Sequence, residues 1–423
     1  MDKRRLAVAL LLTLAALCVG ECAAPAADEA VLVQIDERVN RTPPEAAASI
    51  QSLADYLAKP AGNETQKARA IYAWIIRNID YDVEALTTGN PGDQSAKATL
   101  ARRKAVCDGY SQLFEALARA AGLEAIEVIG FSRGAGYMAG APVGPDPDHA
   151  WTGVRIDGNW FLMDTTWAAG YLDAKTGFVR RLDDYYFLTP PANFVYDHLP
   201  KDPKWQLVPN PIPKEGFERL VYLRPGFFRN GLQVVSHPEV EIVSDGDLTV
   251  TFGGPEEAMM RARVGDATAF RDDIAPTFVQ REGGQLKLNV AFANPGSYTL
   301  RLYAKQKGYD GPYEWAADYR VKVNEVKGLK VFYPETSATF NEVNATLIGP
   351  MSGRLKPGAK ESFKLTAPGA DAVSVIVGGE WLPLAKNGDT WEGEATVKGE
   401  QIQVAARFAG SQSYYVLLTY SVG

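Results

Sequence analysis

Apolar positions recur at helical spacing through the first half of the chain. Residues 47–57 show this spacing behind a Thr-Pro-Pro-Glu segment, which is typical of a helix start. Further helices are predicted over residues 63–78 and 107–122, the last ending on a glycine that suits a helix C-terminus. Strand-like runs follow only after this glycine. The pattern therefore predicts a mixed α+β domain over residues 28–199.

A β-hairpin is predicted around Asp157-Gly158, a dipeptide that favours two-residue turns. One strand covers residues 148–156 and the other residues 159–166, so that the numbers of opposite residues add to 315. Side chains alternate along a strand, and this register places His149 and Asp164 on one face as diagonal neighbours. They should then lie within hydrogen-bonding reach. A loop of odd length would break the arrangement.

After about residue 217 the pattern changes to short strands separated by Gly, Pro, Asn and Asp turns. Two β-sandwiches of immunoglobulin size are predicted, residues 217–325 and 326–423. Three Tyr and Val positions that recur 101 residues later support a tandem repeat. Residues 200–216 contain five prolines, which predicts an ordered connector without regular structure.

The composition agrees with several folded domains and excludes some classes of function. The chain has 423 residues, 46% of them hydrophobic, which suits two to four domains of about 100–200 residues each. Lys and Arg number 44 against 51 Asp and Glu, so the net charge is −7. We therefore expect no nucleic-acid partner, because such proteins bind by neutralising phosphates.

The first 26 residues have the pattern of a secretory signal peptide. Basic residues 3–5 precede an uncharged run over residues 6–20, and small residues around Ala26 offer a cleavage site. Lipid attachment at Cys18 or Cys22 is the less favoured alternative, because no small residue precedes either cysteine. We expect a secreted, periplasmic or cell-envelope protein with no integral membrane span after cleavage.

Signal cleavage would leave Cys107 as the single cysteine, without a disulfide partner. It lies at the predicted start of a helix, where unpaired N–H groups and the helix dipole favour a thiolate. A thiol, an imidazole that removes its proton and a carboxylate that orients the imidazole make a cysteine nucleophile site. We therefore expect Cys107, His149 and Asp164 to be catalytic.

The residues around these positions resemble the transglutaminase-like superfamily. The blocks are Lys-Ala-Val-Cys-Asp-Gly-Tyr at 104–110, His-Ala-Trp at 149–151 and Asp-Thr-Thr-Trp at 164–167, with an entry helix at 70–82. The resemblance implies a papain-like fold, with Cys107 as nucleophile, His149 as base and Asp164 as orienting acid. The family's side-chain oxyanion donor has no evident counterpart, and an alanine, residue 105, stands where a glycine is common.

A narrower resemblance extends past the core. Phe-Leu at 187–188, His-Leu-Pro at 198–200 and Trp-Gln-Leu at 205–207 are similar to the segment after the core in kyphoscoliosis peptidase-like proteins. Those proteins continue into immunoglobulin-like domains, as this chain is predicted to do.

These observations predict a secreted, thiol-dependent acyl hydrolase that acts on amide bonds of a protein or peptide substrate. Acyl transfer to an amine, as in cross-linking, is the enzymatic alternative, because both reactions pass through the same thioester. A non-catalytic envelope scaffold that binds through its β-sandwiches is the third reading. No metal or organic cofactor is implied. The glycine-rich segment 130–144 is expected to form a mobile flap beside the site.

Overall fold

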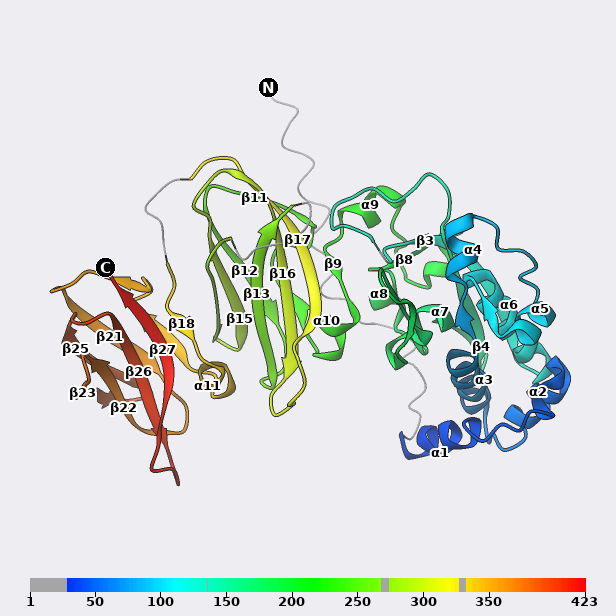
Figure 1. Cartoon of the computed structure of the whole chain (residues 1–423), viewed down its shortest axis with the longest axis horizontal. Coiled ribbons are helices and arrows are strands. Elements are labelled where there is room, and N and C mark those ends of the chain that lie inside the picture. Colours follow the sequence, from blue (N-terminus) through cyan, green and yellow to red (C-terminus); the bar gives the residue numbers. More distant parts are fainter. Residues whose placement is uncertain (1–28, 135, 268–273, 327–331) are drawn as a thin grey trace. The chain divides into compact units, whose positions relative to one another are not determined.

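The computed structural model describes residues 29–134, 136–267, 274–326 and 332–423 (Figure 1). The predicted signal segment, with Cys18 and Cys22, lies outside them. Within the described ranges, no helix is long and apolar enough to cross a membrane. The chain divides into two compact units, which we call the core unit and the sandwich unit. Of the described residues, the core unit comprises 29–131, 146–194 and 200–211, and the sandwich unit comprises the rest.

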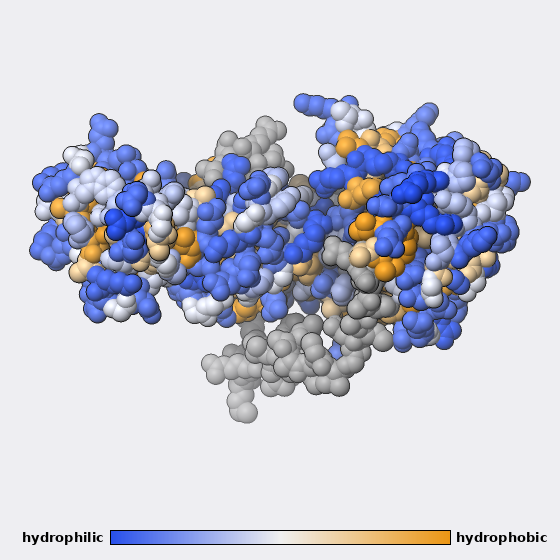
Figure 2. All heavy atoms as spheres, turned by 90° about the horizontal axis from the view of Figure 1, so that it is seen from below, coloured by the Kyte–Doolittle hydropathy of each residue, from blue (hydrophilic) through white to orange (hydrophobic). Residues whose placement is uncertain are grey.

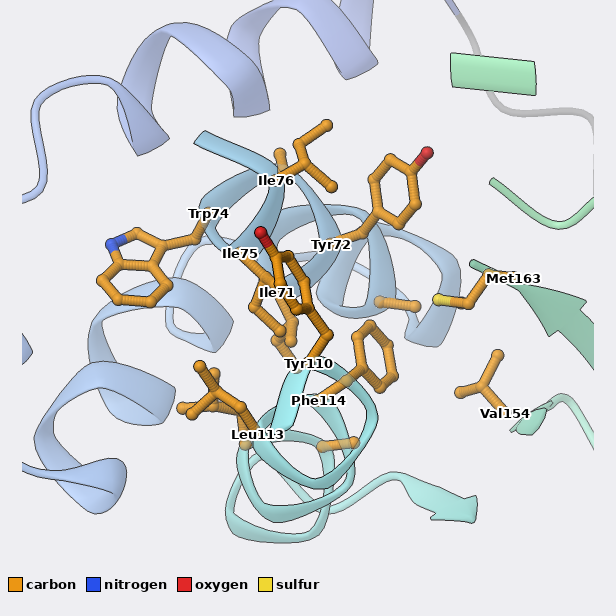
Figure 3. Packing of buried hydrophobic residues seen from close by; sticks show 14 of the residues in the cluster. Ile71, Tyr72, Trp74, Ile75, Ile76, Tyr110, Leu113, Phe114, Val154 and Met163 are labelled. Carbon is orange, nitrogen blue, oxygen red and sulfur yellow. The ribbon is translucent and has the colours of Figure 1, made fainter. Parts of the chain in front are cut away.

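Two buried helices form the centre of the core unit. Helix α3 begins at Glu64 because the Asn63 side chain accepts a hydrogen bond from the Gln66 N–H at 2.9 Å. It shares one apolar cluster with α6, as Figure 3 shows for Tyr72 of α3 and Phe114 of α6. The helices of this part are α1 Glu29–Val39, η1 Ala46–Ala48, α2 Ile50–Ala58, α3 Glu64–Asn78, α4 Val83–Thr88, α5 Ala96–Arg102 and α6 Cys107–Ala120.

An antiparallel sheet packs beside these helices, with β5, β4 and β3 as neighbours in that order. The predicted hairpin register is confirmed, since Thr152 pairs with Met163 and Ile156 with Asn159. Its turn has positive φ at both central positions, as a two-residue hairpin of this kind requires. The strands are β3 Glu124–Ser132, β4 His149–Ile156 and β5 Asn159–Met163, and a small parallel pair is formed by β1 Asp80–Tyr81 and β2 Lys104–Ala105.

The second hairpin strand is shorter than predicted. Strand β5 ends at Met163, and Asp164 is the N-cap of helix α7, Thr165–Ala169. Its carboxylate accepts hydrogen bonds from the N–H groups of Thr166 at 2.7 Å and Trp167 at 3.0 Å. The Asp-Thr-Thr sequence therefore starts a helix and does not extend the strand. The elements that follow are β6 Gly170–Asp173, β7 Gly177–Arg180, η2 Asp184–Tyr186, α8 Pro191–Phe194 and β8 His198–Pro200.

The proline-rich segment 200–216 contains regular structure, contrary to the prediction. A 3-10 helix, η3, covers Pro203–Gln206, and α9 covers Lys214–Arg219. Pro203 is compatible with the first helical position, because the N–H that proline lacks has no helical partner there.

The first β-sandwich has two sheets, β10-β12-β15-β14 and β11-β17-β16-β13, with an apolar cluster from both. Alternating buried and exposed residues along β12 produce this arrangement. Its elements are β9 Tyr222–Leu223, α10 Pro225–Arg229, β10 Gln233–Val234, β11 Glu241–Ser244, β12 Asp247–Gly253, β13 Ala258–Asp266, β14 Thr277–Glu282, β15 Gln285–Ala291, β16 Gly296–Gln306 and β17 Glu314–Val323.

The second β-sandwich repeats this plan. Its sheets are β19-β21-β25-β24 and β18-β27-β26-β22-β23, and its last strand also receives a parallel neighbour, β20, as β17 receives β11. The 101-residue repeat relates these last strands, with Tyr319 and Tyr420 both fully buried. The elements are β18 Glu335–Thr336, α11 Ala338–Glu342, β19 Thr346–Gly349, β20 Arg354–Leu355, β21 Lys360–Thr366, β22 Ala370–Val377, β23 Glu380–Pro383, β24 Ala385–Asn387, β25 Thr390–Thr396, β26 Gln401–Phe408 and β27 Tyr414–Val422.

The two sandwiches contact each other within the sandwich unit. The Gln280 side chain accepts a hydrogen bond from the Leu347 N–H at 2.7 Å and donates one to the Leu347 C=O at 3.2 Å. Phe278 stacks on Tyr333 with the ring centroids 5.7 Å apart. The face seen in Figure 2 is largely hydrophilic, with apolar residues gathered in a few smaller areas.

Candidate active site

Cys107 is the first residue of helix α6 and is partly exposed. The residue before it, Val106, has extended backbone angles and no side-chain oxygen that could cap the helix. Backbone hydrogen bonds form the first turn of the helix, because the N–H groups of Gly109 and Tyr110 donate to the Val106 C=O at 3.0 and 3.3 Å. The first N–H groups of a helix have no partner inside it, so those of Cys107 and Asp108 remain available beside the sulfur.

Gln94 holds the backbone in front of Cys107, a contact that no sequence motif indicates. Its side-chain Oε1 accepts a hydrogen bond from the Val106 N–H at 3.0 Å, and its Nε2 donates to the Pro91 C=O. Gly109 makes room for this side chain, because a Cβ at Gly109 would lie 2.7 Å from Gln94 Oε1. The glycine of the Cys-Asp-Gly-Tyr block thus permits the close approach of a polar loop to the helix start.

His149 and Asp164 form a buried hydrogen-bonded pair. His149 is the first residue of β4, and its Nε2 lies 2.8 Å from Asp164 Oδ2. The other Asp164 oxygen caps α7, so both oxygens are occupied and the carboxylate is fixed. The His149 ring also stacks on Trp167, with centroids 5.1 Å apart and planes inclined by 22°. The predicted proximity of His149 and Asp164 is confirmed, although a helix cap and not a strand presents the carboxylate.

The electrostatic surroundings of His149 favour its protonated form. Burial by itself lowers the pKa of His149, but the charge of Asp164 and its hydrogen bond raise it more strongly. A hydrogen bond and an electrostatic interaction with Cys107 add to the increase. The net result is a His149 pKa above its ordinary value. Of the three predicted residues, His149 and Asp164 are hydrogen-bonded directly, and the electrostatics of His149 also include Cys107.

The charge of Asp108, the residue after Cys107, acts on a second titratable group. Glu127 of β3 is half-buried, and its N–H donates to Glu115 Oε2 at 3.2 Å. Burial, followed by the charges of Asp108 and Glu115, raises the pKa of Glu127 to about 7. The Asp108 carboxylate also lies 3.8 Å from the Cys107 sulfur. The environment of the thiol thus includes the Asp108 carboxylate in addition to His149.

The glycine-rich segment is not the free flap that the sequence suggested, because its described residues 132–134 and 136–145 are held within the sandwich unit. Arg133 is fully buried and donates to the C=O groups of Phe217 and Leu220. The Tyr137 ring packs on Tyr222 with centroids 5.0 Å apart. These partners lie about eighty residues further along the chain, beyond the reach of local sequence patterns.

A nucleophilic thiol at a helix start, served by a histidine from an antiparallel sheet and an aspartate, defines the class of papain-like thiol enzymes. Comparison with known proteins finds two family models along the chain. Residues 51–165 match the family model of the transglutaminase-like superfamily. Residues 214–334 match the model described as the KY-like, immunoglobulin-like domain. The chain therefore combines a transglutaminase-like core domain with a KY-like immunoglobulin-like domain.

Kyphoscoliosis peptidases are among the relatives that match this chain. The mouse (Mus musculus) protein is 30% identical over 333 residues, which are 78% of this chain and 49% of the relative. The human (Homo sapiens) protein is 30% identical over 346 residues, with the same coverage. The Lim and transglutaminase domain protein ltd-1 of Caenorhabditis elegans is 32% identical over 220 residues, 48% of this chain and 29% of that protein. The chain spans about half the length of the kyphoscoliosis peptidases it matches.

Proposed function

We propose that the protein is a secreted, thiol-dependent acyl hydrolase that cleaves amide bonds in a protein or peptide substrate. The observation that carries the proposal is the group formed by Cys107, His149 and Asp164, with a partly exposed sulfur and a buried, fixed base. Membership of the transglutaminase-like superfamily supports the same chemistry. The names of the kyphoscoliosis peptidases support peptide bonds as the substrate class.

In the proposed reaction, His149 removes the thiol proton and the Cys107 sulfur attacks the carbonyl carbon of the substrate. The C=O electron pair moves to oxygen and forms a tetrahedral intermediate. Collapse of this intermediate breaks the C–N bond, and His149 gives its proton to the leaving amine. Water, deprotonated by His149, then attacks the thioester and releases the acid and the free thiol. Asp164 orients the ring and stabilises its protonated form, which accords with the raised pKa of His149.

Acyl transfer is the second candidate, and the superfamily model favours it. In that reaction an amine replaces water as the attacking group, and every earlier step is the same. The nature of the acceptor therefore separates the two reactions.

The test is to incubate the wild-type protein with a peptide library and a labelled primary amine. Cleavage that is lost in Cys107→Ala and His149→Ala, without incorporation of the amine, supports hydrolysis. Cys107-dependent incorporation would establish transfer instead. His237→Ala is the matched control, because His237 lies in the sandwich unit and contacts Ser236 at 2.9 Å. Equal turnover in wild type and Cys107→Ala would support the scaffold reading and contradict both enzymatic ones.

Secretion is proposed on the pattern of residues 1–26 alone. Expression of the full chain in a bacterial host, followed by separation of periplasm, membranes and cytoplasm, tests it. N-terminal sequencing of the exported product should show removal of the leader, and retention of the full-length chain in the cytoplasm would contradict the proposal.

A further inference from the structure

The proposed reaction needs hydrogen-bond donors for the oxygen of the tetrahedral intermediate. This oxygen carries a negative charge, and donors that already point at it stabilise the transition state. The first N–H groups of α6 can supply one donor next to the Cys107 sulfur. The sequence did not identify a side chain for the second position.

Tyr81 lies in the strand beside the segment that leads to the nucleophile. Strand β1 pairs in parallel with β2, and in this pairing Tyr81 is the partner of Ala105. The ladder continues to the next residue, where the Asp82 N–H donates to the Ala105 C=O at 2.9 Å. Because Ala105 is only two residues before Cys107, Tyr81 is held close to the start of α6 by backbone hydrogen bonds.

The register also fixes the side of the strand from which the tyrosine emerges. Paired residues in a ladder project from the same face. The Ala105 side chain is directed toward the first turn of α6, since a Cβ at Gly109 would lie 2.6 Å from the Ala105 Cβ. The Tyr81 side chain therefore leaves its strand on the face that carries this turn, and its ring packs against the apolar core.

The chemical surroundings of the phenol agree with this placement. Burial, and then the charges of Cys107, Asp164 and Asp108, raise the pKa of Tyr81, so the hydroxyl keeps its proton over the neutral range. Within the described part of the chain, its hydroxyl has no hydrogen-bond partner. Two neighbouring tyrosines differ in this respect, since Tyr110 donates to the Ile79 C=O at 2.6 Å and Tyr72 to the Asp183 C=O at 3.0 Å.

We propose that Tyr81 is a catalytic residue whose hydroxyl donates a hydrogen bond to the oxyanion formed when Cys107 attacks the substrate. The proposal rests on the proposed function, because it assigns a donor to the intermediate of that reaction. Gln94, another polar side chain near the helix start, donates its amide N–H to the Pro91 C=O and accepts a hydrogen bond from the Val106 N–H.

The first test compares the turnover of Tyr81→Phe with that of the wild type. This change removes one oxygen atom and keeps the ring, so the fold should remain. We expect kcat to fall about 10²-fold, as for the loss of one oxyanion donor, with little change in KM. Tyr171→Phe is the matched control, because Tyr171 is an exposed tyrosine of β6. Turnover of Tyr81→Phe equal to the wild type would overturn the proposal.

A second test is independent of turnover and uses acetyl-phenylalanyl-glycinal, a peptide aldehyde. The Cys107 sulfur adds to the aldehyde carbon, and the thiol proton moves to the oxygen, giving a hemithioacetal that resembles the tetrahedral intermediate. We expect Tyr81→Phe to bind the aldehyde at least tenfold more weakly and to react with iodoacetamide at the wild-type rate, because alkylation forms no oxyanion. Equal losses in both reactions would show that Tyr81 affects the thiol itself, which contradicts the donor role.

The two proposals fail in different ways. If turnover does not depend on Cys107 but the aldehyde still distinguishes Tyr81→Phe from wild type, the proposed function is wrong and the donor assignment stands. If turnover depends on Cys107 while Tyr81→Phe matches the wild type in both tests, only the donor assignment is wrong. No Cys107-dependent aldehyde adduct in the wild type would contradict the donor assignment directly.

Discussion

Both units bury polar side chains, but the buried groups of the two units have different surroundings. In the core unit, Gln94, His149 and Asp164 are arranged around the start of α6, and the group includes a partly exposed sulfur. In the sandwich unit, the buried Asp318 is satisfied by Arg301, with two contacts of 2.8 Å, and by the Trp315 N–H at 2.9 Å. Burial of polar groups therefore does not by itself indicate a reaction site. What distinguishes the candidate site is that its polar groups surround a partly exposed thiol.

The sandwich-unit network extends through stacked cations and aromatic rings. The Arg301 guanidinium lies 4.1 Å from the Trp315 ring centroid, and Arg224 lies 5.0 Å from the same centroid. Arg224 also donates to the Tyr222 hydroxyl at 2.7 Å, which in turn donates to the Arg133 C=O at 2.9 Å. Such contacts fix the segment after β3 to the first sandwich. These contacts are accounted for by their structural role alone.

The largest expected effect follows from loss of the carboxylate in the core unit. Asp164→Asn should lower kcat by about 10³–10⁴-fold, because an amide stabilises neither the protonated ring nor its orientation. The amide oxygen can still cap α7, so the unfolding temperature should change little. Steady-state kinetics and thermal unfolding measure the two effects.

Asp202→Asn is the matched control for this substitution. Asp202 also caps a short helix, because its side chain accepts a hydrogen bond from the Lys204 N–H at 3.1 Å. Its hydrogen bonds involve neither Cys107 nor His149. A comparable loss of activity in this variant would show that helix capping, and not the charge beside His149, accounts for the Asp164 result.

Breaking the buried ion pair of the sandwich unit should affect stability and leave the thiol unchanged. Arg301→Ala leaves the Asp318 carboxylate buried without its cation, which costs about 3–5 kcal/mol. Chemical denaturation measures the loss, and the rate of Cys107 alkylation measures the effect on the site. A slower alkylation in this variant would contradict the distinction between the two units.

Two buried glutamines provide a direct comparison between the units. Gln94→Ala and Gln280→Ala each remove a side chain that accepts a backbone N–H, from Val106 and Leu347 respectively, at an expected cost of about 1–3 kcal/mol. Only Gln94→Ala should also reduce kcat, by about tenfold or more, because Val106 precedes the nucleophile. Stability and turnover of the two variants, measured side by side, test whether Gln94 positions Cys107. Equal turnover of the Gln94→Ala and Gln280→Ala variants would show that Gln94 has only a structural role.

Local signals in the sequence predicted the candidate site but not the residues that support it. The helix start at Cys107 follows from a periodic apolar pattern, and the pairing of β4 with β5 follows from a two-residue turn. The end of β5 was misplaced because the capping signal of Asp164 was read as a continuing strand. Helix α1, which packs on α3, was also missed.

The contacts that sequence reasoning could not supply join distant segments. Gln94 meets Val106 only because α5 folds against α6, and no repeat or motif marks that glutamine. The anchoring of Arg133 depends on backbone groups of Phe217 and Leu220, which any sequence could provide. A hydrogen bond to a backbone group does not depend on the type of the partner residue, so the sequence does not reveal it. For this reason the glycine-rich segment was expected to be mobile.

The smallest expected effect concerns Glu127, whose pKa is raised to about 7 by burial and by the charges of Asp108 and Glu115. The folded protein holds this proton more tightly than the unfolded chain, whose carboxyl has its ordinary pKa near 4.5. Between these values the unfolded chain releases its proton first, so the contribution of Glu127 to stability falls as the pH rises from about 4.5 to 7.

Glu127→Gln removes this dependence. The variant should unfold at a higher temperature than the wild type at pH 8, and the difference should shrink toward pH 5. Glu124→Gln on the same strand is the control, because Glu124 is exposed and pairs with Arg155 at 3.0 Å. A constant difference across the pH range would show that Glu127 titrates alike in both states.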